Sequence, residues 1–436
     1  MQHFADASCS PVLVADSIDL GATDDSLDRM MRYFAEYGDT YRIRPPGRPE
    51  RWVITDPADI KRVLVTNHRN YTKGIGLDRV RILLGNGIMV SEGDLWRRQR
   101  LMIQPAFHKR AIERFGSLIA AANERCLERW GQAALAGATL DITTEMSELT
   151  LEIILRAIFG HDYASMCDAT GEHPFAVVTR EPARDLAFAF RFRELGRVVL
   201  SLVRRRRSDP DTSHVDLLAM LMNARDAETG AGMTERELVD EVLTLVVAGH
   251  ETTASALNWT WYLLSQHPEA RARLETEVDA AAPTGTGMAE IDRLDYTQQV
   301  IQESLRLYPP GWLITRRSIG TDHLGGYAVP AGTDVLLSPY VIHRHPRYWP
   351  EPERFVPERF AAGATEGRPK HAYVPFVAGP RHCIGETLAM YEMTLHLARA
   401  SRRFRLHYVD DGPIGIEARI NLRTARNLKF VPELRN

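Results

Sequence analysis

The chain has 436 residues, of which 44% are hydrophobic and 25% are charged, a balance that excludes wholesale disorder. Its formal net charge of -3 gives no reason to expect a nucleic acid as partner. The four cysteines are far apart, which argues against a disulfide framework and a structural zinc site. The first twenty residues hold three aspartates and no long apolar run, so we expect no signal peptide, no membrane anchor and a cytoplasmic location.

Apolar periodicity and turn residues predict the elements along the chain. Asp56 is the expected N-cap of a helix that starts at Pro57. Further helices are expected at 27–37, 107–130, 142–159, 268–281 and 296–308. Short strands are expected at 39–43, 51–55, 311–318 and 327–341, with a hairpin after residue 403. Irregular structure is expected at 71–90 and 346–360.

The segment from Ser91 to Arg100 opens a helix in which Trp96 and Arg100 are four residues apart and share a face. The residues alone leave two interpretations open. The guanidinium can stack on the indole ring as a surface pair. Alternatively, the indole N–H and the guanidinium can both face an anionic carboxylate.

Residues 172–207 interleave phenylalanines with arginines and end in four consecutive arginines. We favour amphipathic helices with a solvated basic face, and the alternative is a lid over a substrate site. Because residues two apart do not share a helix face, Phe188, Phe190 and Phe192 cannot all be buried on one side. Exposed aromatics beside arginines would suit a substrate carried by an acidic protein.

Thr234 and Glu237 form a capping box before a long apolar run that ends ahead of His267-Pro268. Its middle reads Ala248-Gly-His-Glu-Thr-Thr253. Glycine is a poor helix former, and a threonine hydroxyl can bond back to a preceding carbonyl. The segment is therefore either a packing defect or an opening in the helical ladder, where Glu251 and Thr252 deliver protons into an apolar site.

The segment Phe376-Val-Ala-Gly-Pro-Arg-His-Cys-Ile-Gly385 places one cysteine, Cys383, in a tight loop before a helix-forming run. Free backbone N–H groups, the helix dipole and Arg381 all favour a thiolate there. Gly379 and Gly385 let the backbone approach a large flat group. A lone cysteine is usually a small buried apolar residue, but this loop also suits a sulfur ligand to a metal such as haem iron.

The pattern Phe376-x-x-Gly379-x-Arg381-x-Cys383-x-Gly385 resembles the haem-thiolate signature of the cytochrome P450 superfamily. The resemblance runs from about residue 39 to the C-terminus. It implies the cytochrome P450 fold of soluble bacterial type, a single large haem-binding domain over 39–436 that is mainly α with a small β region. Residues 1–38 would form an N-terminal extension and a first helix. Four other segments resemble family motifs in the family's order: Trp96-x-x-x-Arg100, Ala248 to Thr252, Glu303-x-x-Arg306 and Pro357-Glu-Arg359-Phe.

The resemblance implies a role for each matched residue. Cys383 would be the axial ligand of haem b iron, and Glu251 and Thr252 would assist O–O cleavage by proton delivery. Arg316 would contact a propionate, although the adjacent Arg317 leaves room for a slip of one residue. The remaining cofactor-binding residues would be Trp96, Arg100, Phe376, Arg381 and Gly385. A structural charge network would contain Glu303, Arg306 and Arg359.

The implied reaction inserts one oxygen atom from dioxygen into a C–H bond or alkene of a hydrophobic small molecule, in bacterial secondary or lipid metabolism. Electrons would come from NAD(P)H through a ferredoxin or flavodoxin and its reductase. A basic patch would receive that acidic partner, formed by Arg97, Arg98, Lys109, Arg110 and Arg399. Two alternatives stay open. One is a peroxide-dependent haem enzyme, against which the intact Glu251-Thr252 pair argues, and the other is a haem-binding sensor without turnover.

Overall fold

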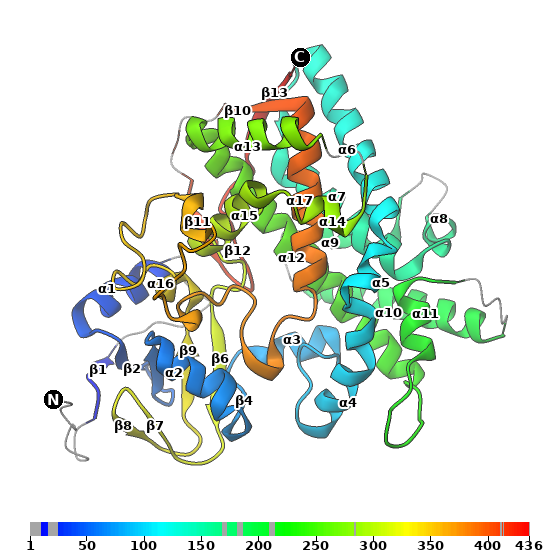
Figure 1. The fold of residues 1–436 in the computed structure, drawn as a ribbon. Helices are drawn as coiled ribbons and strands as arrows, with labels where there is room; N and C mark the ends of the chain where they lie inside the picture. The colour runs from blue at the N-terminus through cyan, green and yellow to red at the C-terminus, as the bar shows by residue number, and fades with distance from the viewer. Residues whose placement is uncertain are drawn as a thin grey trace.

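The computed structural model describes residues 10–15, 25–167, 172–180, 186–208, 214–282, 285–409, 412 and 414–435. Helices make up most of the molecule, and the main sheet lies at the lower left of Figure 1, near the N-terminus. This arrangement confirms the expected mainly α fold with a small β region. Within the described residues, no helix is both long enough and apolar enough to cross a membrane.

The main sheet has six strands in the order β1-β2-β3-β9-β6-β4. The pairs β1–β2 and β3–β9 are parallel and the other pairs are antiparallel. Strand β1 and helix α1 (Ser26–Tyr37), both before residue 39, pack on the same sheet and its apolar cluster. The strands are β1 (Leu13–Ala15), β2 (Thr40–Arg44), β3 (Arg51–Ile54), β9 (Asp334–Leu337), β6 (Ile314–Ser318) and β4 (Tyr71–Lys73).

The C-terminal segment forms more than the single hairpin that we expected. Its first and last strands pair with each other, and the last strand also pairs with a strand at residues 140–141. A separate hairpin lies between them in the sequence. The strands are β10 (Phe404–Tyr408), β13 (Lys429–Leu434), β5 (Leu140–Asp141), and the hairpin β11 (Ile416–Ala418) with β12 (Leu422–Thr424). A further hairpin pairs β7 (Asp322–Leu324) with β8 (Tyr327–Val329).

The helices follow the predicted order with two differences. Residues 71–90, expected to be irregular, contain β4 and a helix, and the helix expected at 107–130 is divided. The chain bends at Gly116, where a Cβ atom would lie 2.8 Å from both the Thr286 carbonyl and the Tyr391 hydroxyl. The helices in the first half are α2 (Pro57–Lys61), α3 (Leu77–Leu84), α4 (Gly93–Ile103), α5 (Lys109–Glu113), α6 (Gly116–Ala136), α7 (Ile142–Phe159), α8 (Asp162–Met166), α9 (Val177–Arg180) and α10 (Leu186–Ser208).

Local capping explains where several helices begin. The Asp56 carboxylate accepts the Ala58 N–H at 2.7 Å, as expected for the N-cap of α2. Thr234 and Glu237 make both bonds of the predicted capping box at the start of α12. The remaining helices are α11 (Leu217–Asn223), α12 (Glu235–Gln266), α13 (Pro268–Ala281), α14 (Met288–Ile291), α15 (Asp295–Leu307), α16 (Pro339–Ile342) and α17 (Glu386–Arg403). The segment 346–360 carries one short 3₁₀ turn, Pro357–Phe360.

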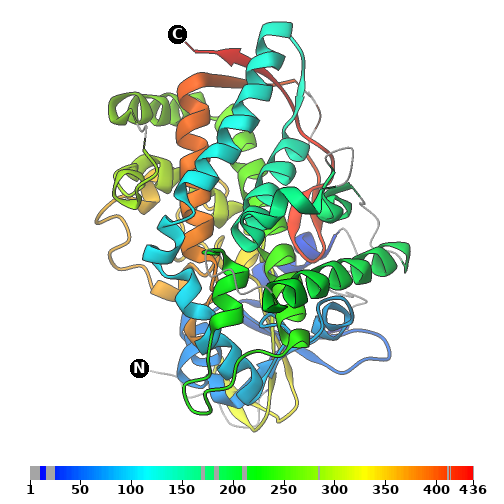
Figure 2. The ribbon, with the colours of Figure 1, turned by 90° about the vertical axis from the view of Figure 1, so that its right-hand side faces the viewer.

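Two helices traverse the interior. Helix α12 packs on α7, α10 and α15, and its neighbour α17 packs on α13 and α15. Figure 2 shows α17, in orange, upright through the molecule. These helices supply much of the largest apolar cluster, so the loop before α17 and the middle of α12 are held by a rigid core.

Candidate functional site

The loop before α17 is fixed by backbone contacts. Gly379 has φ of +72°, and a Cβ atom there would lie 2.0 Å from the Leu64 carbonyl oxygen. Only glycine fits this approach. The Cys383 N–H donates to the Phe376 carbonyl at 2.9 Å, which closes the loop. The position of Cys383 is therefore set by the protein backbone.

Cys383 is accessible to solvent although protein atoms surround it. Burial raises its pKa, and hydrogen bonds from the N–H groups of Gly385 and Glu386, with the charge of Arg100, act in the opposite direction. The sulfur is therefore accessible but poorly solvated. The backbone N–H groups were expected to favour the thiolate, but burial raises the pKa of Cys383 by more than they lower it. A cation bound to the sulfur would stabilise the thiolate further.

The middle of α12 is accessible between two buried stretches of the helix. Ala248 is exposed, and Glu251 and Thr252 are half-buried, between fully buried stretches at 241–246 and 253–261. The Thr252 hydroxyl donates to the Ala248 carbonyl at 2.7 Å, as the sequence suggested, yet the helix is continuous over Glu235–Gln266. The expected break in the helical hydrogen bonds of α12 is thus absent. The only change is that the Ala248 carbonyl also accepts the Thr252 hydroxyl.

Glu251 has a partner that the sequence did not reveal. Its Oε2 atom accepts a hydrogen bond at 3.0 Å from Asn421 Nδ2, in the turn of the β11–β12 hairpin. Nearby, the Ser255 hydroxyl donates to the Leu422 carbonyl and Asn258 donates to Thr424, which hold the hairpin on α12. A contact across 170 residues leaves no local signal in the sequence.

Arg316 is a buried cation. Its side chain donates to the Thr315 carbonyl at 2.8 Å and forms no ion pair with any described residue. Burial and the neighbouring Arg381 lower its pKa to about 10. The adjacent Arg317 instead pairs with Asp334 at 2.8 Å, so Arg316 is the arginine available to an anionic group.

Three more cationic groups lie near Arg316 or the cysteine loop. Arg100 donates to the His382 carbonyl at 2.8 Å. The Trp96 ring is stacked by Arg381, at 3.8 Å from the ring centroid, and not by Arg100. Arg381 also pairs with Glu92 and donates to the Ser91 carbonyl. Sequence reasoning missed Lys73, whose ammonium donates to the carbonyls of residues 88, 89 and 91 and whose pKa is lowered to about 7 by burial and Arg381.

The structure brings Glu303, Arg306 and Arg359 together. Arg306 and Glu303 are fully buried and form two hydrogen bonds, at 2.7 and 2.8 Å. Arg359 approaches Glu303 at 3.4 Å. The other N–H groups of Arg306 donate to the carbonyls of His343, Pro352 and Arg354, so all five donors are used.

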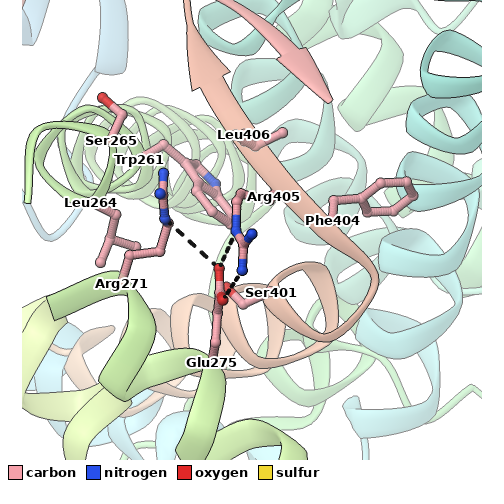
Figure 3. Close-up of a pocket in the computed structure, with 9 residues that line it drawn as sticks. All are labelled: Trp261, Leu264, Ser265, Arg271, Glu275, Ser401, Phe404, Arg405 and Leu406. Carbon is pink, nitrogen blue, oxygen red and sulfur yellow. Dashed lines mark hydrogen bonds and ion pairs between the residues drawn. The ribbon is translucent and has the colours of Figure 1, made fainter. Parts of the chain in front are cut away.

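A pocket between α12, α13, α17 and β10 is shown in Figure 3. Ser401, at its wall, lies at the opposite end of α17 from Cys383. The carboxylate that lines this pocket belongs to Glu275. It is bound by Arg405 at 2.6 Å and faces Arg271. A carboxylate neutralised in this way ties α13 to β10, and we assign the pocket a structural role.

Two surfaces were expected to bind partners, the basic patch and the Phe/Arg-rich segment 172–207. Most of their described cations form ion pairs within the protein. Arg98, Lys109 and Arg399 pair with Glu237, Asp292 and Glu124, whereas Arg97 and Arg110 are exposed. Phe192 is buried, which is compatible with the expectation that the three phenylalanines are not all buried on one side. The side chains of Phe188 and Phe190 lie outside the described residues. Arginines 204–207 pair with Asp162, Asp216 and Glu235.

A haem fits this geometry. The thiol of Cys383 and the middle of α12 are both accessible, and the buried guanidinium of Arg316, which has no ion pair with a described residue, offers a site for a carboxylate. A large flat anionic group with one open metal position would satisfy all three. The residues at this site therefore fit a haem bound through a cysteine thiolate.

The comparisons make this specific. The family model for cytochrome P450 matches residues 13–180 and 182–426, so the chain belongs to the cytochrome P450 family. It is 35% identical to cyclooctatin synthase of Streptomyces melanosporofaciens, over 92% of this chain and 89% of that protein. It is 36% identical to cyclooctat-9-en-7-ol 5-monooxygenase of the same organism, over 86% and 83%. Pentalenene oxygenase of Streptomyces avermitilis is 30% identical, over 92% and 91%.

Solved structures agree. A crystal structure of a cytochrome P450 superposes with a TM-score of 0.87 at 25% identity, covering 98% of this chain and 100% of that one. The heme domain of cytochrome P450DA gives 0.87 at 23% identity, with 98% of each chain covered, and shows the same fold. The protein is a cytochrome P450 monooxygenase, an oxidoreductase that uses haem iron.

Proposed function

We propose that this monooxygenase inserts one oxygen atom into a C–H bond or alkene of a polycyclic terpenoid, using haem b and electrons that derive from NAD(P)H. The substrate class rests on the names of three relatives, which refer to cyclooctatin, cyclooctat-9-en-7-ol and pentalenene. The observation that carries the reaction is that the Cys383 thiol and the Ala248–Thr252 stretch are both accessible, although helices α17 and α12 lie in the core. The reaction consumes dioxygen, two electrons and two protons and releases water with the oxygenated product.

Bound haem would supply dioxygen activation, and the protein residues would supply position, charge and protons. Cys383 would ligate the iron and donate electron density. Arg316 and Arg100 would neutralise the propionates, and the Trp96 indole N–H would donate a hydrogen bond to one of them. The Thr252 hydroxyl, held by the Ala248 carbonyl, would pass protons that reach the site through Glu251.

The ligand assignment is tested by the spectrum of the reduced carbonyl complex. Wild type should show the red-shifted Soret band of a thiolate-ligated haem, and Cys383→Ala should lose it. Cys167→Ala removes a half-buried thiol elsewhere and is the matched control. Retention of the band in Cys383→Ala would exclude this ligand.

Proton delivery is tested at Thr252. Thr252→Ala should bind haem and ligands as wild type does but divert electrons into hydrogen peroxide, because the hydroxyl acts only during turnover. Thr252→Ser keeps the hydroxyl and should restore coupling. Full coupling in the alanine variant would remove Thr252 from the mechanism, and turnover with peroxide alone would favour a peroxide-dependent enzyme.

The electron donor that we propose is an acidic ferredoxin or flavodoxin. Arg97 and Arg110 are exposed and form no ion pair with a described residue, so they are the cations left to receive it. Reduction should slow as ionic strength rises, and Arg97→Glu with Arg110→Glu should weaken that dependence. A rate indifferent to salt would contradict this docking surface. Because arginines 204–207 are paired, we do not extend the proposal to a carrier-bound substrate.

A further inference from the structure

Four aromatic rings that can be oxidised are in contact one after another, and we call them the aromatic ladder. The Trp259 ring, on α12, stacks on Tyr308 at the end of α15, with ring centroids 3.8 Å apart and ring planes 5° apart. Trp259 also contacts Tyr262, three residues further along α12, at 6.1 Å. Tyr262 contacts Tyr408, in β10, at 5.6 Å. These are ordinary distances for aromatic contact. Because tyrosine and tryptophan lose an electron more readily than phenylalanine or histidine does, rings this close can pass an electron along the row.

The inner end of the ladder lies near residues proposed to contact haem. Trp259 follows Thr252 by seven residues, which is two helical turns, so both belong to the same stripe of α12. With a rise of 1.5 Å per residue, they are roughly 10 Å apart along the helix axis. Tyr308 begins the segment that leads into β6, the strand of Arg316. A haem bound as proposed would therefore contact both segments that carry the inner rings.

The buried ring of the ladder can give up an electron but has no acceptor for its proton. Trp259 is 1% exposed, and its indole N–H has no hydrogen-bond partner among the described residues. In contrast, the buried indoles of Trp130, Trp312 and Trp349 all donate hydrogen bonds. An oxidised Trp259 thus keeps its proton, which makes it a strong oxidant toward the next ring.

The outer end of the ladder can release a proton to water. Tyr408 is half-buried, and its hydroxyl oxygen accepts a hydrogen bond from Arg426 at 3.2 Å in an exposed position. Tyrosine that is oxidised beside water loses its phenolic proton and remains as a neutral radical. Oxidation that enters at Trp259 therefore ends at Tyr408, on the surface.

We propose that the aromatic ladder carries an electron from Tyr408 to the haem when the haem is oxidised without a substrate to attack, and so protects the site from damage. The inference rests on the proposed haem at Cys383. With hydrogen peroxide as oxidant, each peroxide takes two electrons and two protons and becomes two waters. One electron comes from the haem and one from Tyr408, whose O–H bond breaks as its proton enters the solvent. A dissolved thiol then gives a hydrogen atom to the tyrosyl radical, and two of the resulting thiyl radicals couple to a disulfide.

The test adds hydrogen peroxide and the nitroso spin trap tert-nitrosobutane to the haem-loaded protein without substrate. Peptide mass spectrometry then locates the trapped radical, which should be on Tyr408 in wild type. Trp259→Phe and Tyr262→Phe should each lose most of this adduct and lose their haem absorbance faster, because phenylalanine cannot relay the electron. Trp259→Tyr restores a ring that can be oxidised and should recover part of the adduct.

Two controls separate the ladder from general oxidation. Trp130→Phe removes a fully buried tryptophan outside the ladder and should keep the adduct on Tyr408. Tyr348 is a half-buried tyrosine outside the ladder, so its labelling reports radicals that diffuse through solution.

Three results would overturn the inference. They are no adduct on Tyr408 in wild type, equal adducts on Tyr408 and Tyr348, and an adduct that is unchanged in both Trp259→Phe and Tyr262→Phe. The carbonyl spectrum is recorded for each protein. Any of these results with a normal band contradicts this inference alone, whereas a missing band in wild type contradicts the proposed function.

Discussion

Adjacent arginines in one strand have opposite roles at this site. Successive strand residues point to opposite faces, so Arg316 is buried beside the cysteine loop while Arg317 reaches Asp334. The resemblance assigned Arg316 to a propionate and left a slip to Arg317 open, and alternation alone could not decide which of the two side chains is buried. Which arginine is buried depends on how β6 pairs with β4 and β9, and these strands are far apart in the sequence.

His396 on α17 is a buried residue whose charge state is fixed by its neighbours. Its Nε2 atom lies 3.2 Å from the Trp261 indole N–H, a donor only, so it must accept, and Nδ1 donates to Asn123 Oδ1 at 2.8 Å. Both bonds require the neutral ring. Burial lowers the pKa of His396 from 6.5 to about 3.

This depressed pKa predicts a loss of stability in acid. Above pH 6.5 both states are neutral and stability is complete; as pH falls toward 3, only the unfolded state gains the proton. His396→Gln keeps both hydrogen bonds in principle and should reduce the pH slope of the unfolding free energy by about 1.4 kcal/mol per pH unit. Urea unfolding between pH 7 and 4 measures it. The exposed His407 provides the control His407→Gln, and equal slopes in wild type and His396→Gln would contradict the assignment.

At the scale of elements, local signals were sufficient where a helix is defined by its own ends. The capping box of α12, the N-cap of α2 and the bounds of α7 and α13 follow from residues within a few positions. Helix α3 was missed because glycines surround it, at Gly76 and Gly85, where the chain adopts positive φ. Asn421 and Lys73 were missed because their contacts join distant segments, which spacing cannot reveal.

The β11–β12 hairpin makes a testable contribution to proton delivery. Asn421→Asp places a second carboxylate against Glu251, so it should move Glu251 and raise hydrogen peroxide release by roughly 2- to 10-fold per electron consumed, with Asn421→Ala intermediate. Electron and peroxide balances measure this. The control is Asn427→Ala, in the same C-terminal segment as Asn421. It removes an exposed amide that donates to Asp141, and it should behave as wild type. Unchanged coupling in Asn421→Asp would show that the hairpin only packs on α12.

At the scale of the whole molecule, Arg306 joins helix α15 to two distant parts of the chain. Its guanidinium bonds Glu303 and the carbonyls of His343, Pro352 and Arg354. The sequence predicted the ion pair and its partner Arg359, but not the three carbonyls. Backbone acceptors carry no residue signature, so only the folded chain identifies them.

Arg306→Lys should therefore be far from conservative. Lysine offers three donors in place of five, which leaves buried acceptors and part of the Glu303 charge unsatisfied. We expect a loss of about 3–5 kcal/mol in unfolding free energy. Arg354→Lys, whose side chain forms an exposed pair with Glu351, should change stability by less than about 0.5 kcal/mol. Thermal unfolding compares them, and similar midpoints would contradict the role of Arg306.

The same guanidinium imposes an order on biosynthesis. The Arg306 guanidinium donates to the carbonyl of Arg354, which the ribosome adds 48 residues after Arg306. At 5–20 residues per second this delay is roughly 2–10 s. During that interval the face of α15 that bears Glu303 and Arg306 lacks acceptors for the charge it must bury, so it stays hydrated on the ribosome. The nascent chain therefore cannot bury this face of α15 until the segment that ends at Arg354 has been made.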